Sequence, residues 1–142
     1  MNKIPLTNNP LVIRTDFDDE SAWHALCDLV RAPVQDGADE FYAYVDFLSS
    51  IEYRGIGKKA LLKRLSDPYS HNVLFIVDRI TLTQRELPIL IVDLSRVPGR
   101  DFRAIPTQIP AIQNNLSISN MDFAEFSAAI DDDGIFRGFV ER

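Results

Sequence analysis

Val73-Leu-Phe-Ile-Val-Asp78 is an apolar run that ends at an aspartate, and two other runs share this pattern, Leu11-Val-Ile-Arg-Thr-Asp16 and Ile89-Leu-Ile-Val-Asp93. Short runs rich in Val, Ile and Phe are typical of strands that are covered on both faces. Where such strands lie parallel in one sheet, their final aspartates meet at one edge, and open α/β sheets place ligands there. Asp16, Asp78 and Asp93 are therefore candidate site residues.

A helix is predicted over residues 18–31, after the first of these runs. Acidic side chains favour the start of a helix because they cap free N–H groups and face the positive end of the helix dipole. Apolar residues then recur at helical spacing and predict a buried stripe: Trp23, Leu26, Cys27 and Val30. After this helix, residues 34–40 are expected to form an acidic loop.

Residues 41–48 alternate in a way that is typical of a strand, with Tyr42 and Tyr44 on one side and apolar residues on the other. A basic helix is predicted over residues 58–65, and a capping-box pattern predicts a short helical turn at Thr83-Gln-Arg-Glu86.

Pro98 and Gly99 stand at the positions that a type II turn favours. This turn predicts that a strand over 101–105 folds back beside a strand over 88–95, so the sheet is mixed. The remainder is predicted to be helical, with one helix over 107–116 and a second that begins at Asp122 and stops near Gly134.

These elements predict an α/β (α+β) fold: one globular domain over residues 1–142, with a mixed sheet of about five strands and helices packed on it. A chain of 142 residues is long enough to bury a core of ordinary size. The hydrophobic content of 46% is typical of a globular chain rather than a disordered one.

The chain is acidic, with a net charge of −6 that is unevenly distributed. Residues 1–52 carry −7, residues 53–110 carry +5 and residues 111–142 carry −4. An acidic chain binds nucleic acid poorly, because phosphate contacts require Lys and Arg, whereas it suits a basic protein partner. The same net charge also simply keeps a protein soluble.

We expect a cytoplasmic protein without a cofactor. The chain contains no apolar run near the roughly 20 residues of a membrane helix. Its N-terminus lacks the apolar stretch of a secretory signal, and one cysteine, Cys27, cannot form an internal disulfide. With two separated histidines it also provides no zinc-site spacing.

Three acidic groups are the candidate contacts for a basic partner. They are Asp18, Asp19 and Glu20; Asp36, Asp39 and Glu40; and Asp131, Asp132 and Asp133. The last group stands where a helix dipole is negative, so an arginine of this chain, a cation or a basic partner would have to stabilise it. Alternatively, these three acids lie in a solvated turn beyond the helix.

Asp16, Asp78 and Asp93 also support a metal hypothesis, because Mg²⁺ prefers carboxylate oxygens and a two-metal phosphoesterase needs such a cluster. Aspartate at a strand end is equally an ordinary turn former and helix cap. The choice depends on whether the three side chains meet.

The stretch Glu52-Tyr-Arg-Gly-Ile-Gly-Lys58 suggests an anion-binding loop, since glycine-rich turns can present backbone N–H groups to phosphate. It resembles the coenzyme A loop of acetyltransferases, whose pattern is Q/R-x-x-G-x-G/A. Gly55 and Gly57 match that pattern, but Glu52 has the wrong charge to face a pyrophosphate. A simple turn that starts a helix explains the same residues. The basic side chains that follow it either meet an anion or pair with acids of the same fold.

Longer segments resemble one family of short, uncharacterised and mostly bacterial proteins. They are Leu11–Phe17, Val73–Asp78, Ile91–Leu94 and, most specifically, Asn114–Phe139. The likeness spans about residues 11 to 139. No activity is established for that family, so it implies no catalytic residue.

Our leading functional hypothesis is a non-enzymatic protein of the bacterial immunity-protein kind, which neutralises a basic toxin such as a nuclease by occluding it. The alternatives are a metal-dependent phosphoesterase at the strand-end aspartates and an anion- or coenzyme-binding transferase at the Gly55–Gly57 loop. The sequence does not determine the oligomeric state.

Overall fold

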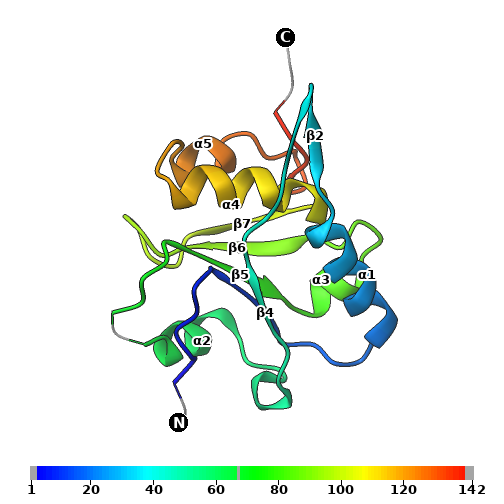
Figure 1. Cartoon of the computed structure of the whole chain (residues 1–142). Helices are drawn as coiled ribbons and strands as arrows, with labels where there is room; N and C mark the ends of the chain where they lie inside the picture. The colour runs from blue at the N-terminus through cyan, green and yellow to red at the C-terminus, as the bar shows by residue number, and fades with distance from the viewer. Residues whose placement is uncertain (1–2, 67, 140–142) are drawn as a thin grey trace.

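Strand β5 (Val73–Val77) is buried along its whole length and lies inside a mixed sheet (Figure 1). The structure is a computed structural model that describes residues 3–66 and 68–139. Within these residues the main sheet has six strands in the order β4-β1-β5-β6-β7-β8. The other five are β1 (Leu11–Arg14), β4 (Asp46–Leu48), β6 (Ile89–Asp93), β7 (Asp101–Ala104) and β8 (Ile135–Phe136).

The sheet combines a parallel and an antiparallel half. Strand β1 pairs in parallel with both β4 and β5, whereas β6 runs antiparallel to β5 and to β7. The short edge strand β8 pairs in parallel with β7. The predicted type II turn joins β6 to β7, with Gly99 at φ +96° and the Arg100 N–H donating to the Val97 carbonyl at 3.3 Å. The predicted mixed sheet is therefore confirmed.

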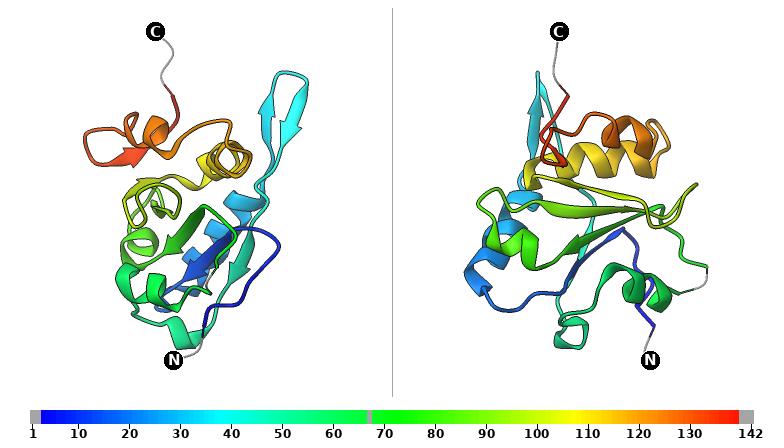
Figure 2. Two further views of the ribbon diagram at one scale, coloured as in Figure 1. Left: turned by 90° about the vertical axis from the view of Figure 1, so that its left-hand side faces the viewer. Right: turned by 180° about the vertical axis from the view of Figure 1, so that it is seen from behind.

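Helices cover both faces of the sheet (Figure 2). One face packs against α1 (Glu20–Arg31), α4 (Ile109–Ser117) and α5 (Phe123–Ser127). The other face packs against α2 (Lys58–Arg64) and the 3-10 turn η1 (Ile51–Tyr53). Alternation along the strands separates the two cores, because Phe75 points to the first face and Leu74 and Ile76 point to the second.

Residues 34–40, predicted to be a loop, instead contribute to a two-stranded hairpin of β2 (Val34–Asp36) and β3 (Asp39–Phe41). The hairpin projects from the body of the molecule (Figures 1 and 2). Asp and Glu are depleted in strands, so local propensity argued against it. Gly37, at φ +63°, supplies the left-handed residue that this turn requires.

Within the predicted strand over 41–48, Asp46–Leu48 forms β4 and Phe41 is the last residue of β3, whereas residues 42–45 are not in a strand. Upstream of β4, the backbone bonds to amide side chains of α4 instead of to a strand. The Tyr44 N–H donates to Gln113 Oε1 at 2.8 Å, and Asn114 Nδ2 donates to the Tyr42 carbonyl at 2.7 Å. The alternation survives, since Ala43 and Val45 pack on the core while both tyrosines are exposed.

The helical turn predicted at residues 83–86 forms earlier, as α3 (Arg79–Thr83). Asp78 begins it by accepting from the Thr81 N–H at 3.0 Å. The helix predicted over 107–116 consists of a 3-10 turn, η2 (Pro106–Gln108), that leads into α4. The predicted start of α5 is confirmed, with the Asp122 N–H donating to Glu125 Oε1 at 3.3 Å.

Truncation of Phe126 tests the core on the face of the sheet that α1, α4 and α5 cover. Phe126 is fully buried and contacts Phe136 with ring centroids 5.4 Å apart, so Phe126→Ala should lower the free energy of unfolding by about 3–5 kcal/mol. Phe139→Ala is the matched control, because Phe139 touches the same cluster but is 52% exposed, and its effect should be below about 1.5 kcal/mol. Equal losses in urea titrations would contradict this assignment.

Candidate functional site

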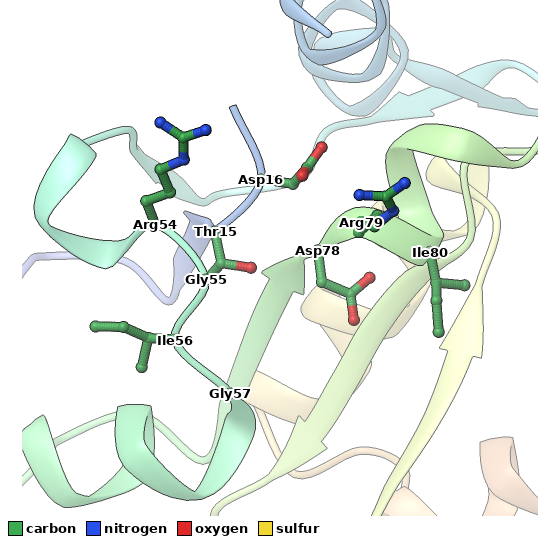
Figure 3. A pocket seen from close by; sticks show the side chains of 9 residues that line it. All are labelled: Thr15, Asp16, Arg54, Gly55, Ile56, Gly57, Asp78, Arg79 and Ile80. Carbon is green, nitrogen blue, oxygen red and sulfur yellow. The ribbon is translucent and has the colours of Figure 1, made fainter. Parts of the chain in front are cut away.

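A pocket of about 450 Å³ opens where β1 and β5 end (Figure 3). Strand β1 connects through α1 on one face to β4, and β4 connects through α2 on the other face to β5. The connections therefore change from one face of the sheet to the other beside β1 and β5. Open α/β sheets bind ligands at such a switch point. Both strand ends, the Arg54–Gly57 loop and the start of α3 contribute its lining: Thr15, Asp16, Arg54, Gly55, Ile56, Gly57, Asp78, Arg79 and Ile80.

Asp78 lines the pocket, but its carboxylate already has structural partners. Arg103 of β7 donates to both of its oxygens, at 2.8 and 3.0 Å. The Thr81 N–H also donates to it, so that Asp78 caps α3. Burial alone would raise the pKa of Asp78, yet the hydrogen bonds from Arg103 and Thr81 outweigh burial and lower it. Asp78 therefore connects the two halves of the sheet.

Asp93 lies at the other end of the strands from Asp78. Because β6 is antiparallel to β5, Asp93 pairs with Val73, the first residue of β5. Its buried carboxylate accepts from Ser95 Oγ at 2.6 Å and from Arg100 Nε at 2.7 Å. The hypothesis that Asp16, Asp78 and Asp93 form one metal site is therefore wrong. Among residues 3–66 and 68–139, no three His, Cys, Asp or Glu side chains are grouped to hold a metal ion.

Asp16 differs from the other two strand-end aspartates. Its side chain lies at the rim of the pocket, across from Asp78 and Arg79 (Figure 3). Its carboxylate accepts no hydrogen bond from the residues that the structure describes, whereas its backbone carbonyl accepts from Arg14 Nε at 2.9 Å. Asp16 is thus the strand-end aspartate available to a ligand.

The glycine loop begins a helix and lines the pocket. The Gly55 N–H donates to the Thr15 carbonyl at 2.8 Å and fixes the loop to the end of β1, and Gly57 begins α2. The loop is therefore a helix-initiating turn that also forms one wall of the pocket. One of the basic side chains that follow the loop pairs within the fold, because Lys58 Nζ lies 2.8 Å from Asp101 Oδ2.

The acids at the start of α1 are mostly engaged within the molecule. Glu20 forms a two-point ion pair with the buried Arg14, at 2.9 and 3.2 Å, and this hydrogen bonding lowers the pKa of Glu20. Asp19 caps α1 by accepting from the Ala22 N–H at 2.9 Å. Asp18 lies between Arg54 and Arg79, at 3.5 and 3.9 Å.

The acids at 131–133 are stabilised by an arginine of this chain. Arg137 contacts Asp131 at 2.7 Å and Asp133 at 2.6 Å, and it also pairs with Glu86. The hydrogen bonds from Arg137 lower the pKa of Asp133. These acids also lie beyond α5, which ends at Ser127. The two explanations that need only this chain, an arginine partner and a turn beyond the helix, therefore both apply.

Five of the predicted contact acids form no ion pair with any residue that the structure describes: Asp36, Asp39, Glu40, Asp132 and Asp19, of which Asp19 caps α1. The first three lie on the projecting β2–β3 hairpin. Asp36 and Asp39 are directly opposite each other in its register. Glu40 accepts from Tyr42 Oη at 2.7 Å and from Gln35 Nε2 at 2.8 Å.

Cys27 lies on the buried face of α1, as predicted. Burial raises the pKa of its thiol to about 11, so the thiolate is scarce near neutral pH.

A comparison with protein families matches residues 9–139 to one described as "Domain of unknown function (DUF6924)". The chain belongs to the DUF6924 family. The resemblance to a family of unknown function is thereby confirmed over nearly the whole chain. A search of curated proteins finds no match to this DUF6924 protein. Among its described residues, no helix has the length and apolar character needed to cross a membrane.

Substitution of Asp93 and of Asp16 compares a carboxylate that supports the fold with one that is available to a ligand. Asp93→Ala should lower the free energy of unfolding by about 2–3 kcal/mol, because Ser95 and Arg100 lose a buried partner. Asp16→Ala should change it by less than about 0.5 kcal/mol. Chemical denaturation of both variants measures the difference, and a larger loss for Asp16→Ala would reverse these assignments.

Acid should destabilise the protein through Asp78 and Asp93, whose pKa values are lowered in the folded state. Their stabilisation is complete above the ordinary aspartate pKa and is lost as pH falls below it and through the lowered folded values. Urea titrations across this range should show a smaller loss in Asp93→Asn than in the unmodified protein. Asp36→Asn, which removes an exposed carboxylate without an ion pair, is the control and should keep the original pH dependence.

Proposed function

We propose that this protein is a protein-binding module that occludes a basic partner, in the manner of an immunity protein acting on a toxin such as a nuclease. The contact is the hairpin surface, defined as Asp36, Asp39, Glu40, Tyr42 and Tyr44. The observation that carries this proposal is the facing pair of Asp36 and Asp39, which has no cation among the described residues.

Like charges directly opposite in a hairpin destabilise it. Several other acids of this chain lie against an arginine, as at Glu20, Asp78, Asp93 and Asp133. Neither carboxylate of the Asp36–Asp39 pair has such a partner among the described residues. Cationic side chains of a partner would relieve its repulsion, so binding would gain what the free hairpin lacks.

The hairpin contributes little to the core of its own molecule. Residues 35–40 are all exposed, and an isolated two-stranded hairpin is marginally stable in water. A projecting segment that buries so little is better explained by recognition than by packing.

The two tyrosines extend this surface with aromatic area. Tyr42 is 39% exposed and Tyr44 is 59% exposed, and tyrosine is enriched at protein interfaces. The amides of Gln113 and Asn114 hold their backbone against α4. Because this backbone is already held, less conformational entropy remains to be lost on binding.

Charge favours a basic partner that itself binds phosphate. A nuclease presents Lys and Arg to nucleic acid, and an acidic projection can occupy the same surface. The net charge of −6 increases the rate at which such partners meet at low salt.

Paired capture experiments test this proposal. The unmodified protein, Asp36→Asn/Asp39→Asn and the control Asp28→Asn/Glu52→Gln are immobilised, exposed to native lysate and eluted along a salt gradient. Both variants lose two charges from exposed carboxylates, so they differ only in position. We expect a basic protein on the unmodified and control columns, released by salt and identified by mass spectrometry. Its association with the hairpin variant should be about tenfold slower.

Inhibition provides the second measurement. If the captured protein is an enzyme, the unmodified protein and the control should suppress its activity and the hairpin variant should not. Equal capture by all three proteins, or no specific capture at any salt, would refute the proposed function.

A further inference from the structure

The pocket between β1 and β5 is not part of the hairpin surface, and its chemistry points to a small ligand. We propose that it binds a phosphorylated small molecule with a free hydroxyl group, such as a sugar phosphate. Arg54 and Arg79 would hold the phosphate and Asp16 would accept from the hydroxyl. This inference does not depend on the proposed protein partner.

The two arginines converge on one anion position from different elements. Arg54 lies in the glycine loop and Arg79 begins α3, yet both guanidinium groups lie within 4 Å of Asp18, at 3.5 and 3.9 Å. Any anion placed where the Asp18 carboxylate lies can therefore contact both. A phosphate offers more acceptor oxygens than a carboxylate and suits arginine geometry.

Their contact with Asp18 is loose compared with the ion pairs that support the fold. The nearest contacts of Arg14, Arg100, Arg103 and Arg137 are 2.6–2.9 Å, the usual range for charged hydrogen bonds. The side chains of Arg54 and Arg79 are 63% and 78% exposed. Their donors are thus available, and Asp18 is a competitor that a ligand would displace.

The acids of the pocket do not exclude an anion. Arg103 neutralises Asp78 through two hydrogen bonds. The Asp16 carboxylate accepts nothing from the described residues and is suited to a hydroxyl donor. Thr15 provides a further hydroxyl, whose bond to the Val77 carbonyl is long at 3.4 Å. Donors for a phosphate and an acceptor for a hydroxyl therefore line the same pocket.

The shape of the pocket agrees with such a ligand. Its volume of about 450 Å³ is within the usual range of small-molecule sites, about 300–1,000 Å³. A Cβ atom added at Gly55 or Gly57 would meet no atom within 4 Å, so the loop leaves open space beside its backbone. Figure 3 shows Thr15, Asp78 and this loop surrounding that space.

Calorimetric titration tests the proposal with ribose 5-phosphate, inorganic phosphate and ribose as probes. The full chain should bind ribose 5-phosphate most tightly. Arg54→Ala/Arg79→Ala should weaken that binding by roughly tenfold for each arginine removed. Arg85→Ala/Arg96→Ala is the control, because it removes two exposed arginines that do not line this pocket, and it should bind as the unmodified protein does.

Removal of the Asp18 carboxylate and removal of the Asp16 carboxylate should affect binding in different ways. Asp18→Asn removes the competing carboxylate and should tighten phosphate binding, whereas Asp36→Asn on the hairpin should not. Asp16→Ala removes the acceptor for the hydroxyl and should therefore reduce the preference for ribose 5-phosphate over inorganic phosphate. Unchanged melting temperatures would show that all variants are folded.

The contrary outcomes are equally definite. Failure of both phosphate probes to bind at millimolar concentration would overturn the proposal, as would equal binding by the Arg54/Arg79 variant and its control. Equal affinity for ribose 5-phosphate and inorganic phosphate would overturn the role of Asp16. None of these results bears on capture by the hairpin, so the two proposals fail separately.

Discussion

The two-point ion pair between Asp78 and Arg103 is the interaction on which the arrangement of this sheet depends. Arg103 belongs to β7 in the antiparallel half, and Asp78 directly follows β5, the strand of the parallel half that borders it. Arg103 also donates to the Pro88 carbonyl at 3.0 Å, just before the strand that separates them. One guanidinium thus holds three chain segments in register at the edge where the pocket opens, and it neutralises a carboxylate that would otherwise repel an anion there.

Local patterns in the sequence were sufficient wherever the structure is locally determined. The apolar runs became β1, β5 and β6, the stripe from Trp23 to Val30 faces the core, and Pro98-Gly99 forms its turn. The direction of β6 was not accessible in this way, because strand direction depends on pairing between distant segments. That is why Asp93 was wrongly grouped with Asp16 and Asp78.

The candidate surfaces show a related limit. Counting acids identified nine possible contacts, but a count cannot distinguish a carboxylate that already has a partner from one that lacks it. Arg137 illustrates this, since it follows the Asp131–Asp133 run in sequence and contacts two of its carboxylates in space. The hairpin was missed because its strands consist largely of residues that disfavour strands, and only Gly37 between short segments hinted at a turn.

The burial of Cys27 has a consequence for how the molecule withstands its surroundings. The fold is held by apolar cores and arginine–carboxylate pairs. Its single thiol lies on the buried face of α1 and is protonated near neutral pH. Neither forming nor breaking a sulfur–sulfur bond is needed to reach or keep this structure. Its folding free energy should therefore be the same in oxidising and reducing solution, and mild oxidants should leave it intact.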